Sequence, residues 1–222
     1  MNLTLFDLDG TLIPVDSDHA FGAFMVEVGW ADGAAWGARN DEFFAQYNAG
    51  TLDLPAYVDF ATSAWRSRPL ADALAMRERF MAEVMRPALR PEAVALIQRH
   101  RDAGDLIALV TATNEFVTAP ICEAFGIEHL IAVQLQRDGA GRYTGAIRGV
   151  PSFREGKIAR VDDWLRGLGA QWRDFGRVTF YSDSTNDLPL LERASHPVAT
   201  NPSPSLARIA AERGWPQLQL FA

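Results

Sequence analysis

The sequence predicts an α/β protein in which a doubly wound, mostly parallel, Rossmann-like sheet carries an inserted, all-helical cap. From residue 87 onward, short apolar runs alternate with helix-length segments, which is typical of a parallel sheet covered by helices on both faces. One further apolar run, residues 3–6, is followed by a long stretch without any strand signal. We therefore expect a core of residues 1–14 and 87–222 and a helical cap of residues 15–86.

The composition indicates an ordinary globular protein. The chain has 222 residues, of which 48% are hydrophobic and 22% are charged. Its formal net charge of -7, and basic residues that do not cluster, disfavour nucleic acid and anionic membranes as partners. No apolar stretch is long enough to span a bilayer, the N-terminus lacks the basic start of a secretory signal, and Cys122 is the sole cysteine. We expect a cytoplasmic protein, whose oligomeric state the sequence leaves open.

Two carboxylates follow the first predicted strand. Leu3–Phe6 is a short buried run, and Asp7 and Asp9 come directly after it, followed by Gly10. Two acids this close repel each other unless a cation or a shared proton intervenes. A divalent cation bound by oxygen, Mg²⁺, satisfies this need. The alternative is an acidic turn in which Asp9 and Gly10 only reverse the chain.

The segment after this motif carries helical signals only. Asp16 and Asp18 are N-cap candidates for the first helix. Helices are expected at residues 19–29, 33–49, 53–65 and 69–85. Their aromatic residues are expected to form the core of a small bundle: Phe21, Phe24, Trp30, Trp36, Phe43, Phe44, Tyr47, Tyr57, Phe60 and Trp65.

In the rest of the chain, predicted strands alternate with predicted helices. Strands are expected at residues 106–110, 130–135, 177–181 and 196–199, with an edge strand at 218–221. Helices are expected at residues 91–103, 114–125, 153–168, 187–194 and 204–213. Residues 138–145 carry the glycine-rich chemistry of a hairpin.

Polar residues gather at the predicted ends of the strands, where ligands of open parallel sheets bind. These residues are Asp7, Asp9, Thr111, Lys157, Asp183 and Asp187. Asp187 follows Asp183 by one helical turn, so both can face one point. Lys157 is the only lysine of the chain and lies in the first turns of a helix, where N–H groups attract anions. Carboxylates, a hydroxyl and an ammonium at one edge fit a phosphate, its magnesium ion and a carboxylate nucleophile.

These residues carry a resemblance to a known family. Asp7-Leu8-Asp9-Gly10-Thr11, then Thr111, then Lys157, then Asp183-Ser184-Thr185-Asn186-Asp187 resembles the four ordered motifs of the haloacid dehalogenase superfamily. The helical insertion between the first and second motifs is similar to that of its phosphoserine-phosphatase-like branch. The match extends from Asp7 to Asp187, and the first and fourth motifs are the specific ones.

The resemblance implies a role for each matching residue. Asp7 would attack phosphorus and form an aspartyl phosphate, while Asp9 would protonate the leaving oxygen and then activate water. Asp9 must then hold a proton near neutral pH, which requires a raised pKa. Thr111 and Lys157 would bind the phosphoryl oxygens. Mg²⁺ would be held by Asp7, the backbone carbonyl of Asp9 and Asp183, with Asn186 and Asp187 close by.

The resemblance also implies a small phosphate ester as substrate, with phosphoserine as the first expectation. Asp16 occupies the place of an acid that receives the substrate ammonium, and Arg66 is a candidate for a substrate carboxylate; capping and solvation are their alternative roles. The second motif reads Thr111-Ala112-Thr113 where phosphoserine phosphatases typically carry Ser-Gly-Gly. Its larger side chains narrow the space beside the phosphate. Histidinol phosphate and phosphocholine therefore stay open as alternatives, since the cap aromatics suit an imidazole or a quaternary ammonium.

A function of another class uses similar residues. Receiver domains of signalling proteins also combine a carboxylate, magnesium, a threonine and a lysine on a parallel sheet. They carry an acidic pair ahead of a separate acceptor and lack a large insertion behind the first strand. Here Asp9 is the second acid of the pair and is well placed for chemistry at a leaving group. The sequence favours a phosphatase over a phospho-accepting domain.

Overall fold

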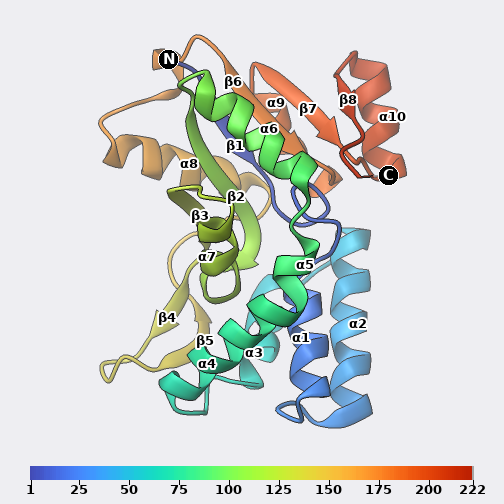
Figure 1. Ribbon diagram of the computed structural model, residues 1–222, viewed down its shortest axis with the longest axis vertical. Helices are drawn as coiled ribbons and strands as arrows, with labels where there is room; N and C mark the ends of the chain where they lie inside the picture. The colour runs from blue at the N-terminus through green and yellow to red at the C-terminus, as the bar shows by residue number, and fades with distance from the viewer. Residues whose placement is uncertain (222) are drawn as a thin grey trace.

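The computed structural model describes residues 1–221 and contains one six-stranded parallel sheet with helices on both faces (Figure 1). The strand order is β3-β2-β1-β6-β7-β8. The strands are β1 (Leu3–Phe6), β2 (Leu106–Asn114), β3 (His129–Val133), β6 (Val178–Ser182), β7 (His196–Thr200) and β8 (Gln217–Leu218). A separate antiparallel hairpin consists of β4 (Leu135–Arg137) and β5 (Tyr143–Ile147). The predicted fold class is confirmed.

The helices of the chain alternate with these strands after an initial helical block. That block contains α1 (Ser17–Glu27), α2 (Gly33–Ala49), α3 (Leu54–Ser63) and α4 (Leu70–Phe80), then the π-helical turn η1 (Met81–Met85) and α5 (Arg86–Ala88). The later helices are α6 (Pro91–Asp102), α7 (Glu115–Ala124), α8 (Glu155–Gly167), α9 (Leu188–Arg193) and α10 (Pro204–Arg213), with short 3₁₀ turns η2 (Trp172–Asp174) and η3 (Thr185–Asp187). Within residues 1–221, none of them is both long and apolar enough to cross a bilayer.

The central strand β1 aligns the strand ends that form the site. All four of its residues are buried, as expected for an apolar run between two neighbouring strands. Phe6 pairs with Leu109 of β2 on one side and with Tyr181 of β6 on the other. Because the three strands are parallel and in register, the residues that follow these positions emerge at one edge of the sheet.

Side chains on the two faces of the sheet belong to two hydrophobic clusters. Leu3 and Leu5 pack in the cluster that contains residues of α8, α9 and α10. Phe6 and Leu109 point to the opposite face, where α6 and α7 contribute. The alternation follows from the two-residue period of a strand, which places successive side chains on opposite faces.

The helical block lies beyond the carboxyl ends of the strands, in the lower half of Figure 1. It shares one continuous hydrophobic cluster with the sheet face of Phe6. Trp65, which follows α3, stacks on Phe116 of α7 at 3.9 Å between ring centroids and meets Tyr143 of β5 edge-on. The hairpin thus packs against the helical block. The division into a core of residues 1–14 and 87–222 and a cap of residues 15–86 stays a prediction.

Several element boundaries differ from those predicted. β2 continues past Thr111 to Asn114, and its pairing with β3 shifts register between Val110 and Asn114. The strand expected at residues 130–135 divides, because the chain leaves the sheet after Val133 to form the hairpin. The helix expected at 69–85 widens into the π turn η1 ahead of Pro87, which has no N–H to donate to the helical ladder.

Candidate active site

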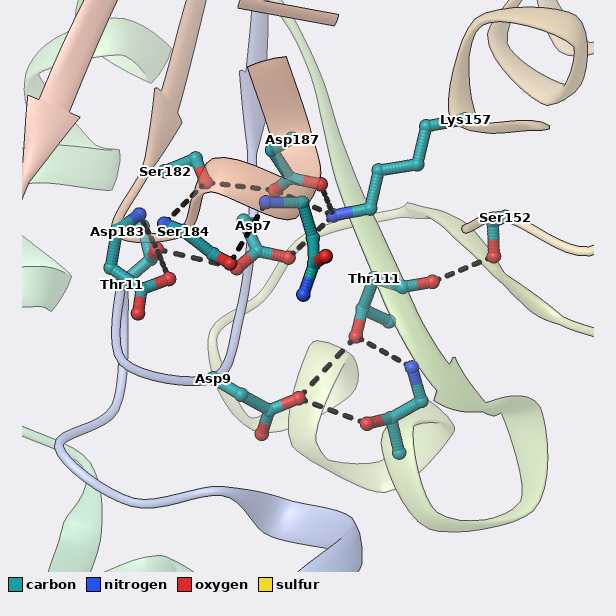
Figure 2. A network of polar contacts seen from close by, with 12 residues as sticks. Asp7, Asp9, Thr11, Thr111, Ser152, Lys157, Ser182, Asp183, Ser184 and Asp187 are labelled. Atoms are coloured by element: carbon teal, nitrogen blue, oxygen red, sulfur yellow. Dashed lines mark hydrogen bonds and ion pairs between the residues drawn. The ribbon is translucent and has the colours of Figure 1, made fainter. Parts of the chain in front are cut away.

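The carboxylate of Asp7 and the ammonium of Lys157 meet at the end of β1 (Figure 2). The Asp7 N–H donates to the Tyr181 carbonyl at 2.9 Å, which carries the β1–β6 pairing one residue past the strand. Lys157 Nζ, from the first turn of α8, lies 2.8 Å from Asp7 Oδ1 and 2.7 Å from the Asp187 carboxylate. Asp7 and Lys157 are buried, with 3% and 1% exposure. Residues separated by 150 positions thus form one buried ion pair.

Burial and charge set the protonation of this pair. Burial raises the pKa of Asp7 to about 7, with Lys157 acting to lower it and Asp187 to raise it. Burial acts to lower the pKa of Lys157, but the carboxylates of Asp187 and Asp7 raise it above its ordinary value. Lys157 is therefore a permanent positive charge beside Asp7.

Asp183, just after β6, faces the loop that follows Asp7. Its backbone N–H donates to Thr11 Oγ1 at 3.0 Å, and Thr11 Oγ1 lies 3.2 Å from Asp183 Oδ1 and 3.4 Å from Asp7 Oδ2. Gly10 has a φ of +73°, and a Cβ placed there would lie 2.4 Å from Asp183 Oδ2. Glycine is required here both by its backbone conformation and by the approach of Asp183.

Asp9 lies two residues beyond Asp7, and its carboxylate is held by three donors, one of which is Thr111 Oγ1 at 3.5 Å. The Ser17 N–H lies 2.6 Å from Asp9 Oδ1, and Thr113 Oγ1 lies 2.9 Å from Oδ2. Burial, followed by the nearby charge of Asp16, raises the pKa of Asp9 to about 7, while the hydrogen bonds act to lower it. Asp9 therefore has the raised pKa that proton donation near neutral pH requires.

The polar residues at the ends of β2 and β6 are positioned by their neighbours. The Thr111 carbonyl accepts from Ser152 Oγ at 2.6 Å, and Thr111 Oγ1 accepts from the Thr113 N–H at 3.1 Å. Ser182 Oγ donates to Asp187 Oδ2 at 2.8 Å. Asn186 Nδ2 donates to the Tyr47 carbonyl at 3.0 Å, so this residue of the fourth motif reaches α2 of the helical block.

The charges at this edge are able to accommodate a divalent cation. The Lys157 ammonium contacts the carboxylates of Asp7 and Asp187, and Asp183 adds a third carboxylate to this edge. Burial together with Asp7 and Asp187 raises the pKa of Asp183 well above its ordinary value. Within residues 1–221, no group of three or more His, Cys, Asp or Glu side chains has metal-binding spacing. An all-oxygen site that completes its coordination with carbonyls, water and substrate phosphate suits Mg²⁺, which seldom uses a cage of side chains alone.

A pocket extends from Asp7 and Asp9 into the helical block. Its lining from the sheet is Asp7, Asp9, Thr111, Ala112 and Thr113. Its lining from α1, α2, α3 and their connections is Asp16, Asp18, His19, Phe43, Phe44, Tyr47, Leu52, Leu54 and Tyr57. Neither set contains an arginine or a lysine. The pocket beyond the reacting groups is therefore acidic and aromatic.

Most residues predicted for the site meet there, and one does not. Asp16 lines the pocket, and its carboxylate also accepts from the His19 N–H at 2.8 Å as the N-cap of α1. Arg66 lies elsewhere, because α3 ends at Ser63 and the chain then turns toward the hairpin. Its guanidinium donates to Thr62 Oγ1 at 2.9 Å and to the Asp59 carbonyl at 2.6 Å. A contact between Arg66 and a substrate in this pocket is not supported by the geometry.

Sequence reasoning missed several pocket residues. Asp18 was predicted only as a capping residue, and His19, Tyr47 and Tyr57 only as parts of helices. The sequence offered one signal, which is a second acid two residues after Asp16. Asp16 is the N-cap of α1, and Asp18 lies in the first turn of this helix and so cannot cap it. The position of Tyr57 depends on how α3 packs, which no local pattern encodes.

Comparisons with known proteins identify the family of the chain and similar structures. The family model of haloacid dehalogenase-like hydrolases matches residues 4–192. A histidinol-phosphatase of Neisseria meningitidis serogroup C (strain 8013) is 42% identical over 217 residues, 98% of each chain. A crystal structure of a protein with unknown function from Bordetella pertussis Tohama I is 48% identical, covers 99% of both chains and has a TM-score of 0.93.

A more distant solved structure agrees in fold. A substrate-bound phosphoserine phosphatase covers 98% of this chain and 92% of its own, with a TM-score of 0.68. At 16% identity this likeness concerns the fold alone. The chain belongs to the haloacid dehalogenase-like hydrolase family, and the prediction of a phosphatase of this family is confirmed.

Proposed function

We propose that the protein is a Mg²⁺-dependent phosphomonoesterase that forms an aspartyl phosphate on Asp7 and acts on L-histidinol phosphate. The observation that carries the reaction is the contact of Asp7 with Lys157 at the edge where Asp9 and Asp183 also lie. The observation that carries the substrate is the acidic, aromatic lining of the adjoining pocket. The relative named histidinol-phosphatase, similar over 98% of both chains, supports the same assignment.

The residues divide the reaction into two balanced steps. A carboxylate oxygen of Asp7 attacks phosphorus, the bond from phosphorus to the ester oxygen breaks, and Asp9 gives that oxygen its proton, which releases the alcohol. Asp9 then takes a proton from a water molecule that attacks phosphorus. The bond from phosphorus to the Asp7 oxygen breaks, so phosphate is released and the Asp7 carboxylate is restored. Lys157 stays charged throughout and stabilises negative charge on the phosphoryl oxygens.

The residues that would hold the metal are oxygen donors. Asp7, Asp183 and the backbone carbonyl of Asp9 would bind Mg²⁺, with Asn186 and Asp187 close by. When bound, the ion would neutralise charge on the phosphoryl group. The excess of carboxylates over ammonium groups at this edge supports the assignment.

The pocket favours histidinol phosphate over the other two esters. Phosphoserine carries a carboxylate, for which the lining offers no cation, since Arg66 lies in another part of the surface. Histidinol phosphate has an ammonium and an imidazole and no carboxylate, so Asp16 and Asp18 complement it. A quaternary ammonium, as in phosphocholine, suits the aromatic walls but has no N–H to donate to these acids.

The test measures phosphate release from L-histidinol phosphate, O-phospho-L-serine and phosphocholine, with Mg²⁺ and with EDTA. We expect the highest kcat/KM for histidinol phosphate, loss of turnover in EDTA and recovery when Mg²⁺ is restored. Asp7→Asn keeps the shape of the side chain but removes the nucleophile, so kcat is expected to fall by more than about four orders of magnitude.

Three outcomes would contradict parts of the proposal. Wild-type turnover by Asp7→Asn would exclude Asp7 as the nucleophile. A preference for phosphoserine would show that the acidic lining of the pocket does not select against a substrate carboxylate. Stable phosphorylation by acetyl phosphate without release of phosphate would instead support the phospho-accepting signalling domain that the sequence left as an alternative.

A further inference from the structure

Asp18 is a buried carboxylate that the proposed reaction does not use. It lies in the first turn of α1, is 6% exposed and lines the pocket beyond Asp9. Asn114 Nδ2, at the end of β2, donates to Asp18 Oδ1 at 3.1 Å. The hydroxyl of Tyr57 lies beside the same carboxylate. Asn114, 96 positions along the chain, therefore holds Asp18 in place, with the hydroxyl of Tyr57 nearby.

This carboxylate has no cationic partner within residues 1–221. Lys157 is paired with Asp7 and Asp187, and His19 Nε2 lies 2.7 Å from Asp41. A buried carboxylate without a cation is costly, and the N-terminus of a helix offsets only part of that cost. Burial and the charge of Asp9 accordingly raise the pKa of Asp18 to about 7. A cationic ligand would supply the charge that the fold leaves out.

Asp16 and Asp18 differ in what their carboxylates already do. Asp16 caps α1 through the His19 N–H, and its side chain is the more exposed of the two. Asp18 takes no part in capping, and Asn114, the residue that holds it, is itself the N-cap of α7. The deeper acid is therefore positioned by the sheet and is free of a structural task within α1.

Aromatic rings line the space around this acid. Tyr57 and Phe43 have ring centroids 5.3 Å apart, and both line the pocket with Asp18. Burial, then the charges of Asp18 and Asp16, raise the pKa of Tyr57 well above its ordinary value, so its hydroxyl keeps its proton. A carboxylate among aromatic faces is a favourable environment for an organic cation.

We propose that Asp18 determines substrate specificity by binding the cationic group, ammonium or imidazolium, that lies beyond the ester linkage. This inference rests on the proposed phosphatase function of the same pocket. Asp18 discriminates by the charge of the alcohol part of the ester. An alcohol part without a cation leaves the buried carboxylate unpaired, and an alcohol part that carries a carboxylate is repelled by it. Asn114 holds the carboxylate in position before the substrate arrives.

The experiment compares Asp18→Asn with the wild type on L-histidinol phosphate and on phenyl phosphate, which carries no cation. We expect kcat/KM for histidinol phosphate to fall by about 10- to 100-fold, chiefly through KM, because hydrogen bonds to charged groups contribute about 1.5 to 3 kcal/mol. The rate with phenyl phosphate should stay at or above the wild-type level. That rate also shows that the variant is folded.

Asp53→Asn is the matched control. Asp53 is the exposed N-cap of α3, the helix that carries Tyr57, and an asparagine can cap in the same way. It removes the same formal charge outside the pocket, so both substrates should be hydrolysed as by the wild type. O-phosphoethanolamine, which has the ammonium but lacks the ring, identifies the group that Asp18 binds. A lower kcat/KM of Asp18→Asn on this ester assigns the ammonium, and an unchanged kcat/KM assigns the imidazolium.

The remaining outcomes separate this inference from the proposed function. Equal losses on both esters would mean that Asp18 only shapes the catalytic groups, and unchanged kinetics on both would mean that it does not touch the substrate; either result overturns the inference and leaves the phosphatase in place. A wild-type protein that hydrolyses phenyl phosphate but not histidinol phosphate would contradict the proposed substrate. In that case, a lower kcat/KM of Asp18→Asn on phosphoethanolamine would still support the binding of a cationic group by Asp18, and an unchanged kcat/KM would overturn it.

Discussion

At the core end of the pocket, formed by the strand ends, the Lys157 ammonium lies within 2.8 Å of both Asp7 and Asp187. At the cap end, formed by α1, α2 and α3, Asp18 has the neutral Asn114 and Tyr57 beside it and, among residues 1–221, no cationic partner. Both ends are buried and both collect carboxylates. The core end carries its own counter-charge on α8, a helix that packs against the sheet. The cap end leaves a negative charge for something outside the chain to balance.

This difference separates chemistry from recognition. Removing a charge at the core end leaves buried partners unpaired, so both the rate and the stability should suffer. Removing a charge at the cap end relieves an unpaired carboxylate, so discrimination should suffer while stability is kept or gained. Variants at the two ends are therefore expected to change stability in opposite directions.

Lys157→Met should have the largest effect on both properties. It leaves Asp7 and Asp187 buried without their cation, which is expected to cost about 3 to 5 kcal/mol in the free energy of unfolding. Loss of the charge beside the phosphoryl group should lower kcat by about two to three orders of magnitude. Urea unfolding and steady-state kinetics measure the two effects. A variant as stable as the wild type would show that the ion pair is not what compensates these acids.

Gly10→Ala should have a smaller effect, directed at Asp183. A left-handed backbone at φ +73° costs a residue with a Cβ about 1 to 2 kcal/mol, and the Cβ would also displace Asp183 Oδ2, 2.4 Å away. Gly104→Ala is the matched control, because Gly104 has a φ of +72° and open space where its Cβ would go. Gly104→Ala should show the backbone cost alone, Gly10→Ala should lose at least as much stability, and only Gly10→Ala should need more Mg²⁺ for half-maximal activity. Equal magnesium dependence would argue against Asp183 as a ligand.

Asp18→Asn should change how stability depends on pH. The folded-state pKa of Asp18 is raised from 3.8 to about 7, so folding favours the protonated carboxyl. The contribution of this group to stability is complete below about pH 4 and is lost as the pH rises toward 7. The variant lacks this loss, so relative to the wild type it should gain up to a few kcal/mol between pH 4 and pH 8. Urea unfolding at both pH values measures the gain. A difference in free energy of unfolding between variant and wild type that stays constant with pH would contradict a raised pKa of Asp18 in the folded state.

The core end could be predicted from the sequence because strand ends are local features. Short apolar runs followed by polar residues place Asp7, Thr111 and Asp183 at one edge of a parallel sheet, whatever the details of packing. The register of β1 between β2 and β6 then brings them together as expected. The single lysine was a further signal, since Lys157 is the cation that the edge requires.

The cap end could not be predicted in the same way. Its residues come from helices whose relative packing follows from tertiary contacts, so the pairing of Asp18 with Asn114 over 96 positions leaves no local pattern. Tyr57 was expected in the core of a helical bundle, and it lines the pocket. The arginine expected there was misplaced because helix ends are uncertain by a residue or two, and such an error rotates a side chain to another face.

Arg66→Ala should have the smallest effect. Its guanidinium contacts Asp59 and Thr62 and lies against Gly145 of the hairpin, away from the pocket that contains Asp7. The pair is partly exposed, so its loss should cost less than about 1 kcal/mol of stability. The kcat/KM values for histidinol phosphate and phosphoserine should both stay at the wild-type level. A selective loss of activity on phosphoserine would mean that the guanidinium reaches a substrate carboxylate. The pocket would then not exclude esters that carry a carboxylate, and its cap end would not lack a cation as the comparison with the core end requires.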